Sequence, residues 1–310
     1  MQEKKNKRLA IILIVLLAAT AAVYWSGRSD NQYAVDKNLY RNFDLKTVDH
    51  ITLESKSGKV DLKFNGSRWK VNEQFDADAN MIDVLFATLQ QVEPKRPIAN
   101  SLQDSTNNAL MQDGVKVNLF AAGQSVYGFQ AGGNLQKTQG IFKGEGDTQS
   151  YQVIIPGYRV YVSGIFELLE KDWRNRLVFA FSWQNFRQLD VSFPDKTQDD
   201  FTIVLDNQVF GVKGISQTDT TKLNAFLDQV SFLDVDEYLP TSPATDSLFS
   251  GKPIVQIKIT DIASRTYTLQ LFPFDKVRNQ FPGLINGSDR AVFAIDKARE
   301  LFKPKRFFQL

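Results

Sequence analysis

The sequence predicts an α+β fold class: an N-terminal transmembrane helix followed by two tandem duplicated α+β modules built of antiparallel hairpins with packed helices. The first observation behind this prediction is a repeated order of patterns. Apolar residues alternate with polar ones through 51–71 and follow a helical period through 78–92, and the same order recurs in 189–212 and 219–233. Such recurrence at a nearly constant spacing is typical of a duplicated module. The second observation is the uncharged run from Leu9 to Trp25, behind a basic tail.

The run from Leu9 to Trp25 predicts a single membrane-spanning helix that acts as an uncleaved signal anchor. At about 1.5 Å per residue it would extend roughly 25 Å, slightly less than the hydrocarbon core of a bilayer. Lysine and arginine gather at 4–8, so the positive-inside rule keeps this tail in the cytoplasm. We therefore expect a single-pass protein of the inner membrane whose C-terminal region is extracytoplasmic, in the periplasm. A cleaved signal peptide is the alternative, because Ala19-Thr20-Ala21 has the small-x-small pattern of a cleavage site.

The predicted organisation follows from these segments. In chain order it is a cytoplasmic basic tail at 1–8, a transmembrane helix at 9–25, a linker at 26–45, a first α+β repeat at 46–180 and a second α+β repeat at 181–310. The chain has no Cys, so core packing rather than disulfides must stabilise the two repeats, and their length is sufficient for that.

The first repeat is predicted to open with three strands and a helix. These are strands at 51–53, 60–64 and 69–71 and a helix from about Ala79 to Gln91. Asn65-Gly66 favours a tight turn between the second and third strands, and Asp76 or Asp78 would cap the helix. The stretch 101–114 is polar and weakly patterned, which predicts a loop with a turn of helix.

The second repeat is predicted to have the same elements in the same order. Its strands are expected at 189–191, 203–205 and 210–212, and its helix, capped by Thr218 or Asp219, from about Thr220 to Leu233. The polar stretch 241–252 stands in the place of 101–114. Both repeats then continue with a second hairpin and a final helix, the hairpins at 115–129 and 254–271 and the helices at 165–170 and 298–302.

Composition excludes several kinds of function. The net charge of +2 comes from the basic tail, so the rest of the chain is nearly neutral and has no electrostatic footprint for nucleic acid. Without Cys, thiol catalysis and cysteine-ligated metals are excluded. The single His, His50, is expected to be structural or exposed and not part of a catalytic triad. We therefore predict that the chain is not an enzyme and binds no cofactor.

Two further patterns are weak site signals. Asp234, Asp236 and Glu237 are close in sequence, but no Gly follows at the position that a calcium loop requires, so no metal site is predicted. Gly132-Gly133 and 140–146 form the most glycine-rich part of the chain, yet no phosphate-loop spacing is present. We expect a mobile loop there, which could offer a contact surface.

Aromatic and basic residues gather where the two repeats meet, and this is the predicted interaction surface. Its members are Tyr158, Arg159, Tyr161, Trp173, Arg174, Arg176 and Trp183. Packing between the repeats is the simplest explanation of such a cluster. Aromatic and arginine side chains are also what protein interfaces and sugar-binding clefts favour, so the cluster is the best candidate location for function.

Several segments resemble one known family, the domain of unknown function 4340 family. They are the strand-turn-strand run Val60 to Val71 with the helix start at Ala77-Asp78, the helix Met81 to Val92, the segment Tyr151 to Gly164, and the run from Arg174 to Val178. The resemblance spans nearly the whole region after the anchor, and Phe210 departs from it where the first repeat has Trp69. It implies a single-pass extracytoplasmic protein, often encoded near components of ABC-type exporters, including those associated with gliding motility. The family has no established activity.

Two functions remain open on this sequence. The first is a membrane-tethered extracytoplasmic interaction module, an accessory part of an envelope complex such as an ABC-type exporter. The alternative is a periplasmic protein that binds a glycan or a peptide in the cleft between the repeats, with or without hydrolysing it. Two carboxylates within about 10 Å of each other beside Trp173 or Trp183 would favour hydrolysis.

Overall fold

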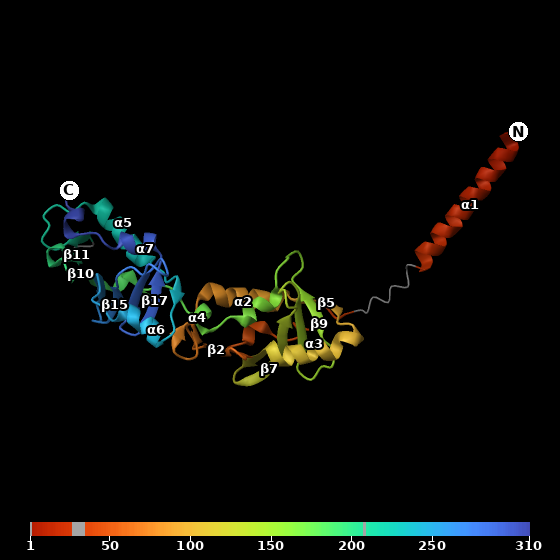
Figure 1. Cartoon of the computed structure of the whole chain (residues 1–310), viewed down its shortest axis with the longest axis horizontal. Coiled ribbons are helices and arrows are strands. Elements are labelled where there is room, and N and C mark those ends of the chain that lie inside the picture. The colour runs from red at the N-terminus through yellow and green to blue at the C-terminus, as the bar shows by residue number, and fades with distance from the viewer. Residues whose placement is uncertain (1, 27–34, 207–208) are drawn as a thin grey trace. The chain divides into compact units, whose positions relative to one another are not determined.

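The computed structural model of the chain describes residues 2–26, 35–206 and 209–310. The fold is α+β, with two antiparallel sheets and few helices. Two compact units, Met1–Glu170 and Lys171–Leu310, each contain one of the sheets. Figure 1 shows the chain coloured from red at the N-terminus to blue at the C-terminus.

Helix α1 spans Gln2–Ser26 and includes the segment for which the sequence predicts a membrane helix. Its described side chains, at 11–23, are exposed, and most of them are large and apolar. Within the part of the chain that the structure describes, none of the helices has both the length and the apolarity that a membrane span needs. The membrane anchor therefore stays a prediction.

The first unit is built around one antiparallel sheet of nine described strands in the order β4-β3-β2-β1-β6-β7-β8-β9-β5. The strands are β1 (His50–Ser55), β2 (Gly58–Phe64), β3 (Trp69–Val71), β4 (Phe75–Asp76), β5 (Glu93–Pro97), β6 (Val115–Ala121), β7 (Gln124–Gly133), β8 (Gly140–Gly144) and β9 (Tyr151–Ile154). The helices of this unit are α2 (Ala79–Gln91) and α3 (Asn100–Asp113), with 3₁₀ turns η1 (Leu45–Thr47) and η2 (Val162–Glu167).

The second unit has an antiparallel sheet of eight described strands in the order β12-β11-β10-β14-β15-β16-β17-β13. The strands are β10 (Phe186–Ser192), β11 (Phe201–Asp206), β12 (Val209–Val212), β13 (Glu237–Tyr238), β14 (Val255–Asp261), β15 (Thr266–Leu271), β16 (Phe281–Ile285) and β17 (Asp289–Phe293). The helices are α5 (Thr220–Ser231), α6 (Pro243–Asp246) and α7 (Ile295–Glu300), with 3₁₀ turns η3 (Trp183–Asn185), η4 (Thr197–Asp199), η5 (Ser247–Phe249) and η6 (Lys305–Phe308). The short helix α4 (Glu170–Trp173) begins at the last residue of the first unit and continues into the second.

Apart from β4, the two sheets have the same strand order. The order β3-β2-β1-β6-β7-β8-β9-β5 corresponds strand by strand to β12-β11-β10-β14-β15-β16-β17-β13. The register agrees as well: Ile51 on β1 lies opposite Leu62 on β2, and Leu189 on β10 lies opposite Ile203 on β11. All four side chains are fully buried, because alternate residues of each strand face the helix-covered side of the sheet.

Helix α2 begins where the sequence predicts, and Asp78 is the capping residue. Its carboxylate accepts hydrogen bonds from the backbone N–H groups of Asn80 and Met81, at 2.8 and 3.4 Å. These N–H groups have no partner inside the helix, so the side chain satisfies them. Ile82, Leu85 and Leu89 then form the buried face of α2. Asp219 caps α5 in the second unit.

Replacing Asp78 with Ala is expected to lower the free energy of unfolding of the first unit by about 1 kcal/mol, because the cap is lost. Urea denaturation checks this value. Asp83→Ala is the matched control, since Asp83 is an exposed carboxylate on the same helix but lies beyond the first turn. Equal effects of the two substitutions would mean that the charge, and not the cap, is what matters.

Three predicted local structures differ from the observed ones. The polar stretch 101–114 is the helix α3, which buries Leu110 alone and so lacks a clear apolar stripe. The glycine-rich stretch 140–146 is largely the strand β8 and not a mobile loop. A Cβ on Gly140 would lie 3.1 Å from both Ser163 Oγ and a methyl carbon of Val153, so close packing explains this Gly. The final helix expected at 165–170 is the 3₁₀ turn η2.

Part of the predicted linker 26–45 belongs to the core of the first unit. Tyr40 is only 1% exposed, and its hydroxyl donates a hydrogen bond of 2.9 Å to the backbone carbonyl of Phe142. The two rings meet edge to face with centroids 5.3 Å apart. Nearby, Tyr127 donates to the carbonyl of Leu39 at 3.2 Å. The hydrogen bonds of Tyr40 and Tyr127 therefore hold the segment before β1 against the sheet.

Alkaline pH is expected to destabilise the first unit through these tyrosines. Burial raises the pKa of Tyr127 to about 12 and also raises the pKa of Tyr40. The unfolded chain releases each phenolic proton near pH 10 while the folded chain keeps it, so the free energy of unfolding falls as the pH rises above about 10. Urea midpoints at about pH 8 and pH 11 check this. The double variant Tyr40→Phe/Tyr127→Phe is expected to lose less stability between the two pH values; an equal loss would contradict the assignment.

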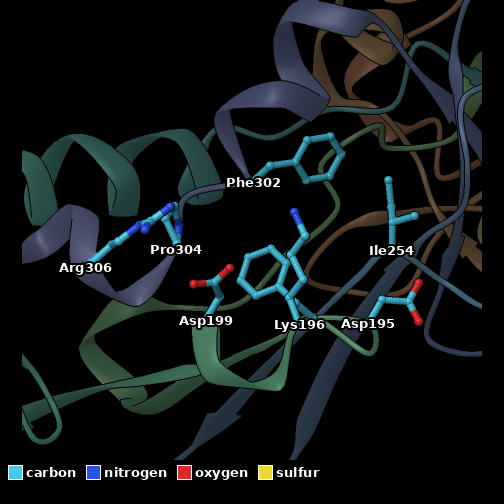
Figure 2. Close-up of a pocket in the computed structure, with 8 residues that line it drawn as sticks. Asp195, Lys196, Asp199, Ile254, Phe302, Pro304 and Arg306 are labelled. Carbon is cyan, nitrogen blue, oxygen red and sulfur yellow. The ribbon is translucent and has the colours of Figure 1, made fainter.

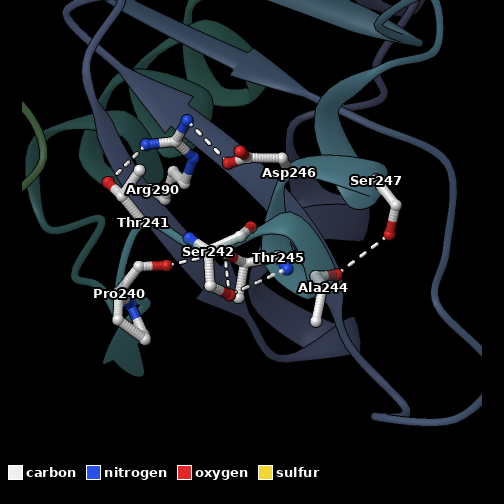
Figure 3. A network of polar contacts seen from close by, with 8 residues as sticks. All are labelled: Pro240, Thr241, Ser242, Ala244, Thr245, Asp246, Ser247 and Arg290. Atoms are coloured by element: carbon white, nitrogen blue, oxygen red, sulfur yellow. Dashed lines mark hydrogen bonds and ion pairs between the residues drawn. The ribbon is translucent and has the colours of Figure 1, made fainter.

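The stretch 241–252 is a short structured turn in the second unit, held by a polar network (Figure 3). The Ser242 side chain caps α6 by accepting from the Thr245 N–H at 3.3 Å, and the Thr245 hydroxyl donates to the carbonyl of Pro240 at 2.6 Å. Arg290 on β17 binds Asp246 at 2.8 Å and donates to the Thr241 hydroxyl at 2.7 Å. The turn is therefore fixed to the sheet although its sequence is polar.

The compact units divide at Glu170 and Lys171, whereas the sequence placed the boundary at 180 and 181. The residues just after this division bond within the second unit. Arg174 binds Asp289 at 2.8 Å, and the Val178 N–H donates to the carbonyl of Leu233 at 2.9 Å. The second unit therefore begins earlier than its first strand pattern indicates.

Candidate functional site

The structure divides the predicted interaction surface between the two units. Tyr158, Arg159 and Tyr161 belong to the first unit, and Trp173, Arg174, Arg176 and Trp183 belong to the second. Exposure separates them further. Tyr158, Arg159 and Arg176 are exposed, Tyr161 and Trp183 are half-buried, and Trp173 and Arg174 are buried.

Tyr161 is part of a hydrogen-bonded chain at the wall of a cavity of about 710 Å³ in the first unit. Its hydroxyl donates to Glu167 Oε1 at 2.6 Å, and Glu167 Oε2 binds Lys137 at 2.6 Å. Burial and the bond to Glu167 raise the pKa of Tyr161. The phenol therefore keeps its proton at neutral pH and donates it in the hydrogen bond to Glu167.

Arg174 is held by contacts within the second unit. Besides the ion pair with Asp289, its guanidinium lies 3.8 Å from the centre of the Tyr238 ring. Both contacts stabilise the charge in a buried place. Trp173 beside it is fully buried. These two residues hold the fold together and are not open to a ligand.

Trp183 is packed within the second unit as well. It stacks on Phe186, with ring centroids 5.5 Å apart, and meets Phe181 at 4.8 Å. Phe186 in turn meets Phe210 edge to face at 5.3 Å. Trp183, Phe186 and Phe210 therefore form a continuous aromatic cluster within the second unit.

A pocket of about 460 Å³ lies in the second unit between the β10–β11 loop and the C-terminal segment (Figure 2). Its lining residues are Phe193, Asp195, Lys196, Asp199, Ile254, Phe302, Pro304 and Arg306. In Figure 2 the Lys196 side chain points towards Phe302, and Asp199 lies between Lys196 and Arg306. Asp195 is bound by Lys252 at 2.6 Å. The pocket thus offers apolar surface with charges of both signs and could hold a small zwitterionic group.

A further open site in the first unit was not predicted from the sequence. It is a groove of about 410 Å³ lined by Leu45, Lys46, Val48, Phe64, Trp69, Phe86 and Gln90, which we call the aromatic groove. Trp69 meets Phe86 edge to face at 5.4 Å and lies 5.9 Å from Phe64. Phe64 is 40% exposed. The sequence assigned these residues to the core alternation, and the one visible signal was that Phe210 replaces Trp69 in the second repeat.

The single histidine has a structural environment. His50 Nε2 lies 3.0 Å from Asp61 Oδ2, and its ring stacks on Phe120 with centroids 4.8 Å apart. Among the described residues, no three His, Asp or Glu side chains lie close enough together to hold a metal ion. Asp234 and Asp236 both bind Lys297, at 2.7 Å each. Lys297 therefore lies between the two carboxylates and balances one of their two negative charges.

No known family model matches this chain, and no curated protein matches it either. The resemblance to the domain of unknown function 4340 family therefore stays a prediction.

Proposed function

We propose that this chain is a membrane-tethered extracytoplasmic interaction module, an accessory part of an envelope complex, whose two α+β modules arose by duplication. The aromatic groove is the observation that carries the proposal, because exposed aromatic surface beside a rigid sheet is typical of a protein-binding site. The equal strand order of the two sheets supports the duplication. The uncharged run after the basic tail supports the tether and the orientation. An ABC-type exporter component is the partner that the family resemblance implies.

In-cell crosslinking followed by affinity purification and mass spectrometry tests this proposal. The full-length chain is compared with a form in which Met1 to Trp25 is replaced by a cleavable signal peptide, so that both forms are exported. We expect one defined envelope assembly to be captured by the anchored form and not by the released form. If both forms capture the same assembly, the interaction does not need the membrane tether, and that part of the proposal is wrong. Capture of no partner by either form would overturn the interaction function.

A further inference from the structure

The duplicated fold allows the aromatic groove to be compared with the same place in the second unit. Trp69 on β3 lies opposite Phe64 near the end of β2, and Phe210 on β12 lies opposite Leu205 near the end of β11. This shared register makes Trp69 and Phe210 equivalent. Leu45 in η1 stands as many residues before Ile51 as Trp183 in η3 stands before Leu189. By the same count Val48 is equivalent to Phe186.

In the second unit this place holds aromatic side chains of the chain itself. Trp183 stacks on Phe186, which meets Phe210, and Trp183 packs against the buried core of the unit. In the first unit the equivalents of Trp183 and Phe186 are the smaller Leu45 and Val48, and here the groove of about 410 Å³ opens onto Trp69. The second unit thus shows what kind of side chain this part of the fold accommodates.

We infer that the aromatic groove binds an aromatic side chain of a partner polypeptide, in the place that Trp183 occupies in the second unit, and that an acidic residue flanks this side chain. The acidic neighbour follows from Lys46, which is the single ionisable residue among those lining the groove. Lys46 is exposed, and no ion pair joins its ammonium to another residue of the described chain. A positive charge at the edge of a binding site mainly determines which partner binds and in which orientation, and it adds less to the affinity. The inference rests on the proposed function, which it narrows to one surface and one partner chemistry.

Fluorine NMR of the full-length chain in lipid nanodiscs tests the inference, with fluorotryptophan at the four Trp positions and Trp69→Phe to assign the Trp69 signal. The probe is a synthetic Asp-Trp-Asp peptide with blocked ends, compared with Asp-Ala-Asp and Lys-Trp-Lys. We expect the Asp-Trp-Asp peptide alone to shift the Trp69 signal below about 1 mM. Leu45→Trp gives the first unit the side chain that the second unit has, so it is expected to weaken binding about tenfold or more.

Two further variants make the test specific. Leu135→Trp adds the same side chain on a loop, at a position that is 97% exposed, and is expected to bind like the unchanged chain. Lys46→Glu is expected to bind Lys-Trp-Lys better than Asp-Trp-Asp. If no peptide shifts the Trp69 signal at about 1 mM, or if Leu45→Trp binds as well as Leu135→Trp, the inference is wrong.

Other occupants of the groove give different results. If a second copy of the chain covers it, the unchanged protein is a dimer at micromolar concentration and Leu45→Trp is a monomer, and the partner inference fails. The crosslinking comparison separates this inference from the proposed function. When Leu45→Trp captures the same assembly as the unchanged chain, the interaction function stands and the groove is not its site.

Discussion

Replacing Tyr40 with Ala is expected to lower the free energy of unfolding of the first unit by about 3–5 kcal/mol, which is the usual cost of removing a large buried aromatic side chain. Tyr40 lies outside every strand and helix, yet its ring packs among Phe129, Phe142 and Tyr151. Its removal would leave a cavity under the sheet and the carbonyl of Phe142 without its donor. Hydrogen exchange of peptides from β7 and β8, together with urea denaturation, measures the effect in this unit.

Two variants divide this effect into its parts. Tyr40→Phe keeps the ring and removes the hydroxyl, so we expect a loss of about 1 kcal/mol, the usual contribution of one hydrogen bond. Asn42→Ala alters an exposed side chain of the same segment and is expected to change the free energy of unfolding by less than about 0.5 kcal/mol. If Tyr40→Ala were no worse than Asn42→Ala, the segment before β1 would be an undocked linker, as the sequence suggested.

Replacing Phe308 with Ala is expected to destabilise the second unit by a similar amount, about 3–5 kcal/mol. Phe308 is fully buried although it lies close to the end of the chain. Its ring meets Phe201 on β11 at 4.9 Å and Phe226 on α5 at 5.4 Å, and its carbonyl accepts from the Asp219 N–H at 2.9 Å. The residue therefore joins a strand, a helix and the cap of that helix.

Leu310, two residues after Phe308, provides the control substitution. Leu310 is also large and apolar but is 82% exposed, so Leu310→Ala is expected to leave the unfolding midpoint within error. Hydrogen exchange of α5 and β11 peptides measures both variants. Fast exchange in the Phe308→Ala variant, with the first unit unchanged, is the expected pattern. If both variants behaved alike, the C-terminal turn would contribute nothing to the core.

Strong periodicity explains which elements the sequence could predict. Helix α2 has the predicted bounds because Ile82, Leu85 and Leu89 mark one face and Asp78 marks the start. Helix α3 was missed because Leu110 is its only buried residue. Strand β8 was missed because its glycines resemble a loop in composition, whereas Gly140 is needed for close packing against Val162 and Ser163.

Composition was a poorer guide to the candidate site than to the fold. The seven aromatic and basic residues of the predicted surface look alike in sequence, but a tryptophan packed into a core and one on a surface cannot be told apart by residue type. Burial separates Trp173 and Arg174 from the exposed Tyr158, Arg159 and Arg176. The aromatic groove was not predicted because its opening depends on the size of the side chains before the first strand, such as Leu45 and Val48. Neither repeat has a regular apolar pattern in that stretch.

The equal strand order of the two sheets also bears on how the chain reaches its native state. Apart from β4, each strand of one sheet has a competing position in the other sheet. Mispairing between similar domains is a known hazard of repeat proteins. All strands of the first sheet end by Ile154, before β10 begins at Phe186. A chain synthesised from its N-terminus can therefore complete the first sheet before any competitor exists. A denatured chain that refolds at full length lacks this protection, because both sets of strands are present from the start.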